Sequence, residues 1–342
     1  MRADIIELRP EGLYCTAGDF YIDPWQPVPM AIITHAHSDH ARRGCEKYLS
    51  NTLAKNVLYK RLGNITLQTI DYGEIIRHRG VRVSLYPAGH ILGSAQVKIE
   101  YRGETWVVSG DYKVENDNIH QSFEPIQCDT FITESTFGLP IYRWQPQSVI
   151  QAQINNWWKD NASQNRTSIL FCYALGKAQR LLSLLDCSIG PILAHGAIEP
   201  INQIYRETGV ALPQTYMVTQ ITDKVALEKA LVLAPPSASR TTWLKRFGHF
   251  SDAFASGWMQ IRGRRRIKSI DRGFVLSDHA DWAGLLSAIR ETNADRIIVT
   301  HGYSEIFARY LNEQGFDAQT FSTEFGENHE NDDSPLDHSI ET

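Results

Sequence analysis

The chain has 342 residues with 34 basic and 39 acidic side chains, so its formal net charge is −5. The apolar fraction of 42% is enough to form sizeable cores. No stretch approaches the roughly 18 apolar residues of a membrane helix, and the N-terminus lacks the apolar region of a signal peptide. Five cysteines without a CxxC pair are typical of reduced thiols. We therefore expect a cytoplasmic protein with no part embedded in a membrane.

Short strands dominate the first part of the predicted fold. The pattern of apolar residues predicts strands at 13–16, 20–23, 31–34, 65–70, 81–87, 95–101 and 105–109, with one helix at 53–62. Arg102-Gly103, between the last two strands, is typical of a hairpin turn. The first part of the chain is therefore expected to form a sheet, and most helices follow later in the sequence.

From about residue 146 the pattern changes to an alternation of helices and strands. Helices are predicted at 147–160, 175–187 and 198–208, and strands at 169–171, 191–194 and 231–234. This alternation is typical of a parallel α/β unit. A strand at 273–276, a helix at 282–292, a strand at 296–300 and a helix at 304–314 follow. Residues 324–342 carry seven acidic side chains and no Lys or Arg, which predicts a disordered tail.

A dense group of potential metal ligands follows the predicted strand at 31–34. His35, His37, Asp39 and His40 stand within six residues of one another. Neutral imidazoles and a carboxylate suit Zn²⁺ and similar divalent ions. Four ligands this close cannot all face one ion, so the pattern predicts two neighbouring ions.

Three further apolar strands lead directly to a ligand-type side chain. These side chains are His90, Asp111 and His301, and each has a glycine beside it. Glycine permits the tight backbone that a site often requires. The repetition of this design predicts that the three residues complete the site that begins at His35.

These motifs together resemble the metallo-β-lactamase superfamily. The stretches TESTFG at 133–138, LSDHAD at 276–281 and VTHG at 299–302 resemble its β-CASP nuclease branch. ALGKAQR at 174–180 resembles the first helix of the β-CASP insert. The stretch from Gly18 to Arg42, with GDFYIDPW and THAHSDHAR, is most similar to the bacterial ligase-associated DNA exonuclease family.

The resemblance implies an α/β fold, namely an αββα metallo-β-lactamase sandwich with an inserted β-CASP α/β domain. On this interpretation, residues 1–145 form the first part of the metallo-β-lactamase domain, and residues 146–269 form the insert. Residues 270–323 form the C-terminal part of the first domain, and 324–342 remain as the acidic tail.

The resemblance also implies a role for each site residue. His35, His37 and His90 would hold one ion; Asp39, also a catalytic residue, His40 and His301 would hold the second; and Asp111 would bridge them. The ions would be Zn²⁺, with Mn²⁺ as an alternative. His279 would be the general acid, oriented by Glu134, with Asp23 and Asp281 as supporting carboxylates. The alternative for Glu134 is a helix or turn cap.

A basic stretch with aromatic residues lies between Arg240 and Arg272. Its densest part supplies the candidate nucleic-acid-binding residues Arg262, Arg264, Arg265, Arg266 and Lys268. Basic side chains neutralise phosphates, and aromatic rings such as Trp243, Phe247 and Phe254 stack on unpaired bases. The alternative is a solvated charged turn whose aromatic residues belong to a core.

The implied function is a two-metal DNA exonuclease in DNA repair, with DNA favoured over RNA and a functional association with a DNA ligase and a helicase. A ribonuclease for RNA 3′-end processing or decay remains open. So do a non-catalytic scaffold and, less well matched to Glu134 and His279, a small-molecule hydrolase. Tyr303 departs from the pattern of many RNA-processing members, which carry Glu after His-Gly.

Overall fold

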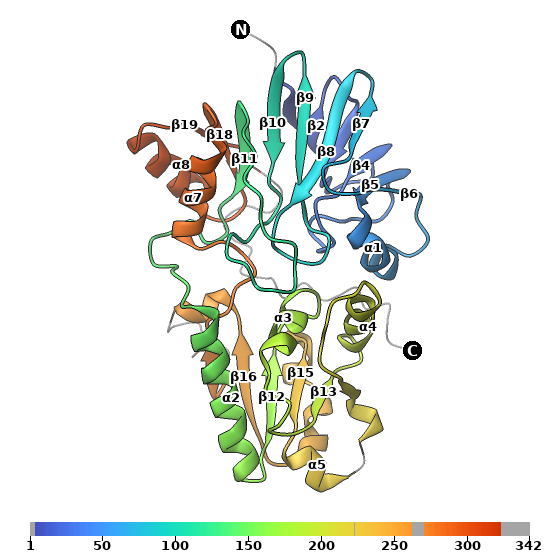
Figure 1. Cartoon of the computed structure of the whole chain (residues 1–342), viewed down its shortest axis with the longest axis vertical. Helices are drawn as coiled ribbons and strands as arrows, with labels where there is room; N and C mark the ends of the chain where they lie inside the picture. Colours follow the sequence, from blue (N-terminus) through green and yellow to red (C-terminus); the bar gives the residue numbers. More distant parts are fainter. Residues whose placement is uncertain (1–3, 222, 262–269, 323–342) are drawn as a thin grey trace. The chain divides into compact units, whose positions relative to one another are not determined.

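The computed structural model describes residues 4–221, 223–261 and 270–322. The chain divides into two units (Figure 1). Among the described residues, the first contains those up to Tyr142 and those from His279 to Ser322, and the second those from Arg143 to Asp278. These boundaries lie near 142/143 and 278/279, where the sequence predicts 145/146 and 269/270. The predicted tail at 324–342 lies outside the described residues.

Two sheets form the first unit. One has the order β1-β2-β3-β4-β5-β6, in which β3 to β6 are parallel, and the other the order β19-β18-β11-β10-β9-β8-β7. The strands of the first sheet are β1 (Ile6–Arg9), β2 (Gly12–Cys15), β3 (Phe20–Ile22), β4 (Met30–Ile32), β5 (Lys47–Asn51) and β6 (Leu67–Ile70). Those of the second are β7 (Ile75–His78), β8 (Val81–Pro87), β9 (Ala95–Tyr101), β10 (Glu104–Val108), β11 (Thr130–Glu134), β18 (Arg296–Thr300) and β19 (Asp317–Thr320).

One core lies between these sheets, because the alternating side chains of both contribute to it. Phe20 and Ile32 come from the first sheet, and Val97 and Trp106 from the second. A second core lies on the other face of the second sheet, where α7 (Trp282–Thr292) and α8 (Ser304–Glu313) pack. α1 (Lys55–Leu62) follows β5. The arrangement is the metallo-β-lactamase fold that the sequence predicts.

The helix ends show why the chain turns where it does. The Asp281 carboxylate accepts the backbone N–H of Gly284 at 2.8 Å and so caps the start of α7. Asn293, with a left-handed φ of 49°, ends the same helix. The hairpin between β9 and β10 uses Arg102 and Gly103, both with positive φ.

The second unit is a parallel sheet with helices on both faces. Its strand order is β14-β13-β15-β12-β16-β17, and all pairs are parallel. The strands are β12 (Thr167–Phe171), β13 (Ile192–Ala194), β14 (Tyr216–Met217), β15 (Leu231–Ala234), β16 (Phe250–Ala255) and β17 (Arg272–Phe274). The helices are α2 (Gln147–Ser163), α3 (Lys177–Leu184), α4 (Glu199–Glu207) and α5 (Lys224–Glu228). Short 3₁₀ helices occur at Thr52–Ala54, Val218–Gln220, Pro236–Arg240, Thr242–Phe247 and Gly257–Gln260.

Two cores cover the faces of this sheet. α2 and α3 pack on one face through Ile154, Trp158 and Leu181, and Phe247 and Met259 are among the residues buried on the other. Among the described helices, none combines the length and the apolarity that crossing a membrane requires.

Candidate metal centre

The ligand loop begins where β4 ends. Ile33 continues the ladder between β4 and β5 by donating its N–H to Leu49 O at 2.8 Å. The loop then turns tightly, because Ala41 donates its N–H to His37 O at 2.8 Å. Arg61 of α1 donates from its guanidinium to Ala36 O. The backbone of the loop is therefore held both by the sheet and by α1.

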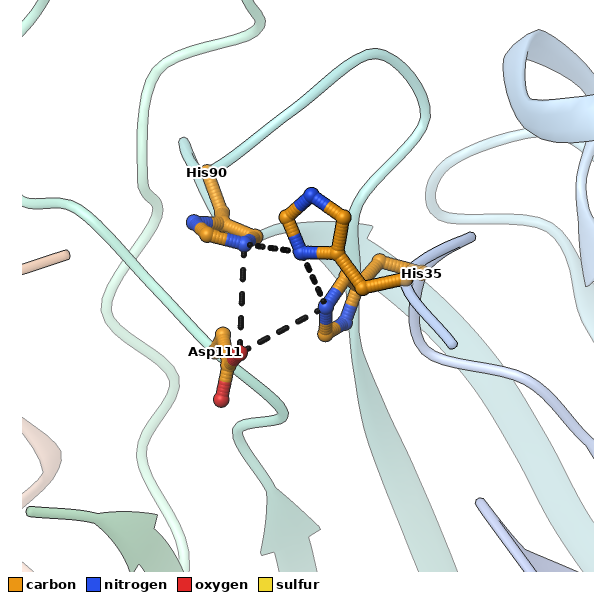
Figure 2. A group of neighbouring side chains, drawn as sticks. His35, His90 and Asp111 are labelled. Atoms are coloured by element: carbon orange, nitrogen blue, oxygen red, sulfur yellow. Dashed lines mark hydrogen bonds and ion pairs between the residues drawn. The ribbon is translucent and has the colours of Figure 1, made fainter. Parts of the chain in front are cut away.

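Three imidazoles and one carboxylate converge beside this loop. The facing ring nitrogens of His35 and His37 lie 3.1 Å apart, and those of His37 and His90 lie 3.0 Å apart. Asp111 Oδ2 lies 3.5 Å from His35 Nε2 and 3.8 Å from His90 Nε2. Figure 2 shows His35, His90 and Asp111 facing one another from three different segments. All three are buried, so the donor atoms face a site that is largely shielded from solvent.

The same oxygen of Asp111 also faces a second group. It lies 3.4 Å from His40 Nε2, which is in turn 3.5 Å from Asp39 Oδ2. Asp39, His40 and Asp111 offer ligand atoms within 4.8 Å of one another, as His35, His37, His90 and Asp111 do. Asp111 therefore belongs to both groups.

His301 reaches this second group from the end of β18. Its ring centroid lies 5.3 Å from that of His40, and it lines a small cavity together with Asp39 and His40. No group of ligand atoms within 4.8 Å includes it among the described residues. The structure thus brings His301 beside the site, slightly further out than the other six candidate ligands.

The backbone at His301 is strained in a way that explains the glycine after it. His301 has a φ of +51° and Gly302 a φ of +69°, and a Cβ at Gly302 would collide with the backbone of Ser135 and Thr136. The Ser135 hydroxyl donates to His301 O. The sequence does not reveal this role of Ser135, since only the tertiary contact between β11 and β18 places it there.

The electrostatics of the site favour a bound cation beside Asp111. Burial lowers the pKa of His35 well below its usual range. Burial would also lower the pKa of His40, but the carboxylates of Asp111, Asp39 and Asp23 outweigh it and raise that pKa well above its usual range. Burial alone would raise the pKa of Asp111, yet His40 and His279 hold it well below its usual range. Imidazoles and ionised carboxylates in this arrangement fit divalent ions such as Zn²⁺.

Asp23 contacts one of the candidate ligands from behind. Its Oδ2 accepts a hydrogen bond from His40 Nδ1 at 2.7 Å. The same carboxylate accepts from the Thr34 N–H at 2.8 Å and from the Thr34 hydroxyl at 2.5 Å. A carboxylate on Nδ1 fixes the tautomer and leaves Nε2 to face a metal. Thr34 joins Asp23 to the ligand loop, a role that the sequence alone does not reveal.

A His–Glu pair adjoins the ligands. His279 Nδ1 lies 3.0 Å from both carboxylate oxygens of Glu134, and its ring centroid lies 4.6 Å from that of His90. Glu134, the last residue of β11, is 1% exposed and accepts the N–H of Tyr112 at 2.8 Å. It also lies 3.4 Å from the Thr136 N–H, so a turn-capping contact coexists with the one to His279. The His279 side chain is 16% exposed, which leaves it accessible to a substrate.

The remaining candidates are Asp281 and the basic, aromatic stretch between Arg240 and Arg272. The Asp281 carboxylate caps α7, and its supporting role at the site stays a prediction. Phe247 and Phe254 are 5% and 3% exposed and belong to a core of the second unit, so they do not serve as stacking surfaces. The basic residues Arg262, Arg264, Arg265, Arg266 and Lys268 lie outside the described residues.

Comparison with known proteins adds relatives of two kinds. No model of a known protein family matches the chain. A probable DNA ligase of Opitutus terrae is 28% identical over 310 residues, which is 90% of this chain and 30% of that protein. Endoribonuclease YSH1 of Candida albicans is 33% identical over 122 residues, and cleavage and polyadenylation specificity factor subunit 3 of Dictyostelium discoideum is 29% identical over 122 residues.

The last two matches cover 35% of this chain and 14% and 16% of those proteins. The chain thus spans less than a third of the length of any of these relatives. Among solved structures, a protein of unknown function from Enterococcus faecalis V583 has the same fold, with a TM-score of 0.59 and 12% identity over 87% of this chain and 80% of that chain.

Proposed function

We propose that the chain, which resembles the β-CASP branch of the metallo-β-lactamase superfamily, is a two-metal nuclease, and specifically a DNA exonuclease in DNA repair. The observation that carries this proposal is the His279–Glu134 pair beside His90. A metal cluster alone suits many hydrolases, but a buried carboxylate behind an accessible imidazole suits protonation of a departing oxygen.

We assign the ligands in two sets. His35, His37 and His90 would hold one ion, Asp39, His40 and His301 would hold the other, and Asp111 would be shared by both. The position of Asp111 Oδ2, 3.4 Å from His40 Nε2 and 3.5 Å from His35 Nε2, supports a bridging role. The imidazole-rich ligand set favours Zn²⁺, with Mn²⁺ as the alternative. When bound, two such ions supply Lewis-acid catalysis and a water of lowered pKa.

Residues of the chain orient a ligand and supply the proton for the leaving oxygen. Asp23 holds His40 in one tautomer through Nδ1. Glu134 holds Nδ1 of His279, so Nε2 of His279 carries the proton given to the leaving oxygen. The charge of Glu134 stabilises the protonated imidazole before that transfer, and the N–H of Tyr112 keeps the carboxylate in place. Hydrolysis of the phosphodiester thus has a general acid at a defined atom.

The preference for DNA rests on the relative that covers most of this chain, whose name is that of a DNA ligase. In that protein the matching segment is part of a much longer chain, which supports a functional association of the present chain with a ligase. An association with a helicase, and a cytoplasmic location, rest on the family resemblance alone.

An RNA substrate is the second candidate. Relatives named as endoribonucleases support it, with 33% identity over 122 residues in one case. Tyr303 weighs against a direct transfer, since many RNA-processing members carry Glu at that position. Here the Tyr303 hydroxyl instead lies 3.2 Å from the Tyr142 hydroxyl.

The deciding experiment uses purified protein loaded with Zn²⁺ or Mn²⁺ and end-labelled single-stranded DNA and RNA of matched sequence. We expect stepwise loss of nucleotides from one end of the DNA, and none with the Asp111→Asn variant. Degradation of RNA alone would replace the DNA proposal with the ribonuclease one. The label that is released first gives the polarity.

A further inference from the structure

The second unit carries an aromatic and basic group at the carboxyl end of β13. His195 directly follows β13 and donates its N–H to Leu233 O of β15 at 2.9 Å. Trp243, in the 3₁₀ helix Thr242–Phe247, packs edge to face with His195, with ring centroids 5.0 Å apart. Open parallel sheets bind their ligands beyond the carboxyl ends of the strands. The Trp243–His195 pair lies in such a position.

Trp243 packs against the core of the second unit and yet is only partly buried. Phe247 anchors it, because the two rings meet edge to face at 4.8 Å and Phe247 is 5% exposed. The orientation of the indole is therefore set before any ligand arrives, which lowers the entropic cost of binding. Any apolar side chain would be enough to cover the core at this position. A partly exposed indole offers, in addition, a flat ring on which a base can stack.

Basic side chains lie near this ring in the sequence, and no acidic residue accompanies them in this segment. The Arg246 guanidinium carbon lies over one face of the Trp243 ring, 5.7 Å from its centroid, and the proposed stacking uses the other face. Arg240, Lys245 and Arg246 are exposed, and the sequence has no acidic residue between Ala234 and Ser251. Within the part of the chain that the structure describes, none of the three basic side chains forms an ion pair. Solvated faces usually mix both signs of charge, so this surface is suited to a polyanion.

His195 adds a hydrogen-bond donor. Its Nδ1 accepts the N–H of Ala197 at 3.1 Å, so in the neutral ring the proton resides on Nε2. Burial and the charge of Arg246 lower the pKa of His195, which favours the neutral ring. Nε2–H has no partner among the described residues and can donate to a phosphate or to a base.

We propose that Trp243, Arg246 and His195 bind one nucleotide of an unpaired strand. Trp243 stacks on the base, Arg246 contacts a neighbouring phosphate, and His195 donates a hydrogen bond from Nε2. Such stacking tolerates any base, because every base has a π face, and it discriminates against duplexes, whose bases are already stacked. The inference rests on the proposed function, because it names the form of nucleic acid that the second unit binds.

The test measures the affinity of the intact chain for a short fluorescein-labelled oligothymidylate in EDTA, so that cleavage plays no part. Trp243→Leu keeps an apolar side chain over the core but removes the π face. We expect it to weaken binding at least about fivefold, the lower end of what one base–aromatic stack contributes. Trp243→Phe should retain most of the affinity, and a blunt duplex should bind both variants as it binds the wild type.

The charge is tested separately by the salt dependence of binding. Arg246→Ala should reduce the slope of log K against log salt by about 0.7, the value for one phosphate of a single strand. Lys224→Ala is the control: it removes an exposed positive charge, paired with Glu228, from α5 of the same unit and should leave the slope unchanged.

Wild-type affinity in Trp243→Leu, with an unchanged circular dichroism spectrum, would overturn the proposal. So would equal weakening in the Leu and Phe variants, because that pattern indicates a packing role. The outcome does not depend on the nuclease proposal: if the metal-loaded chain cleaves no nucleic acid but Trp243→Leu still weakens binding selectively, only the nuclease proposal fails.

Discussion

Replacing Glu134 by Gln isolates the charge behind the proposed general acid. The substitution keeps the size of the side chain and one acceptor oxygen for His279 Nδ1 and the Tyr112 N–H. It removes the negative charge that stabilises the protonated imidazole at 3.0 Å. A hydrogen bond between charged groups contributes about 1.5–3 kcal/mol, and Gln retains part of it. A loss of about 2 kcal/mol corresponds to a fall of about thirtyfold in kcat.

The assay compares two substrates under single-turnover conditions. Single-stranded DNA has a poor leaving group that needs a proton, whereas a p-nitrophenyl phosphodiester of thymidine has a good one. We expect Glu134→Gln to slow DNA cleavage about thirtyfold and to leave the nitrophenyl ester nearly unaffected. Glu313→Gln, an exposed carboxylate of α8, is the matched control and should change neither rate.

Two results would refute the reasoning. An equal loss on both substrates would mean that Glu134 does not act through leaving-group protonation. Loss of bound metal in Glu134→Gln or His279→Ala would mean that the pair holds an ion, since Asp111, Glu134 and His279 also lie within 4.8 Å of one another.

Three further substitutions test single contacts within the two units. Asp23→Asn weakens the hydrogen bond to His40 Nδ1 and should lower the affinity for the second metal about 10- to 100-fold in a competition titration. Unchanged affinity would contradict the role of Asp23 in orienting His40. Gly302→Ala places a Cβ against the backbone of Ser135 at a φ of +69°. It should lower the free energy of unfolding, measured in urea, by about 1–3 kcal/mol, and a variant as stable as the wild type would show that this position is not strained. Arg180→Ala breaks a buried ion pair with Asp278 and should lower the free energy of unfolding by about 3–5 kcal/mol in the same urea titration. A loss below about 1 kcal/mol would show that the pair contributes little to stability.

Segments with a strong local signal were predicted with their observed bounds. β9 alternates apolar and polar side chains, and α7 begins at an Asp cap and ends at a left-handed Asn. β15 is a continuous apolar run and β18 has an apolar centre, and their bounds also match.

Segments whose character depends on tertiary packing were missed. β5 was not predicted, because it contains Ser50 and Asn51, which are fully buried only through contacts with distant segments. β16 is hidden for a different reason: its aromatic residues stand in a basic stretch that suggests nucleic-acid binding, while Phe254 packs into the core.

The candidate site follows the same rule. His35 to His40 are recognisable because they are close in sequence, and His90, Asp111 and His301 because each follows an apolar strand. Arg61, Thr34 and Ser135 lack such a signal, since their contacts with the ligand segments arise only from the fold. The cap at Asp281 and the proposed role of that residue could not be separated from sequence, because an Asp before a helix fits both.

The central claim is that one chain holds two ions bridged by Asp111. Native mass spectrometry of the purified chain with a slight excess of Zn²⁺ tests this most directly, because it counts the ions bound to each molecule. We predict a mass increase of two zinc ions for the wild type and at most one for Asp111→Ala. A wild-type protein that binds a single ion, or that binds two equally well without Asp111, would contradict the account.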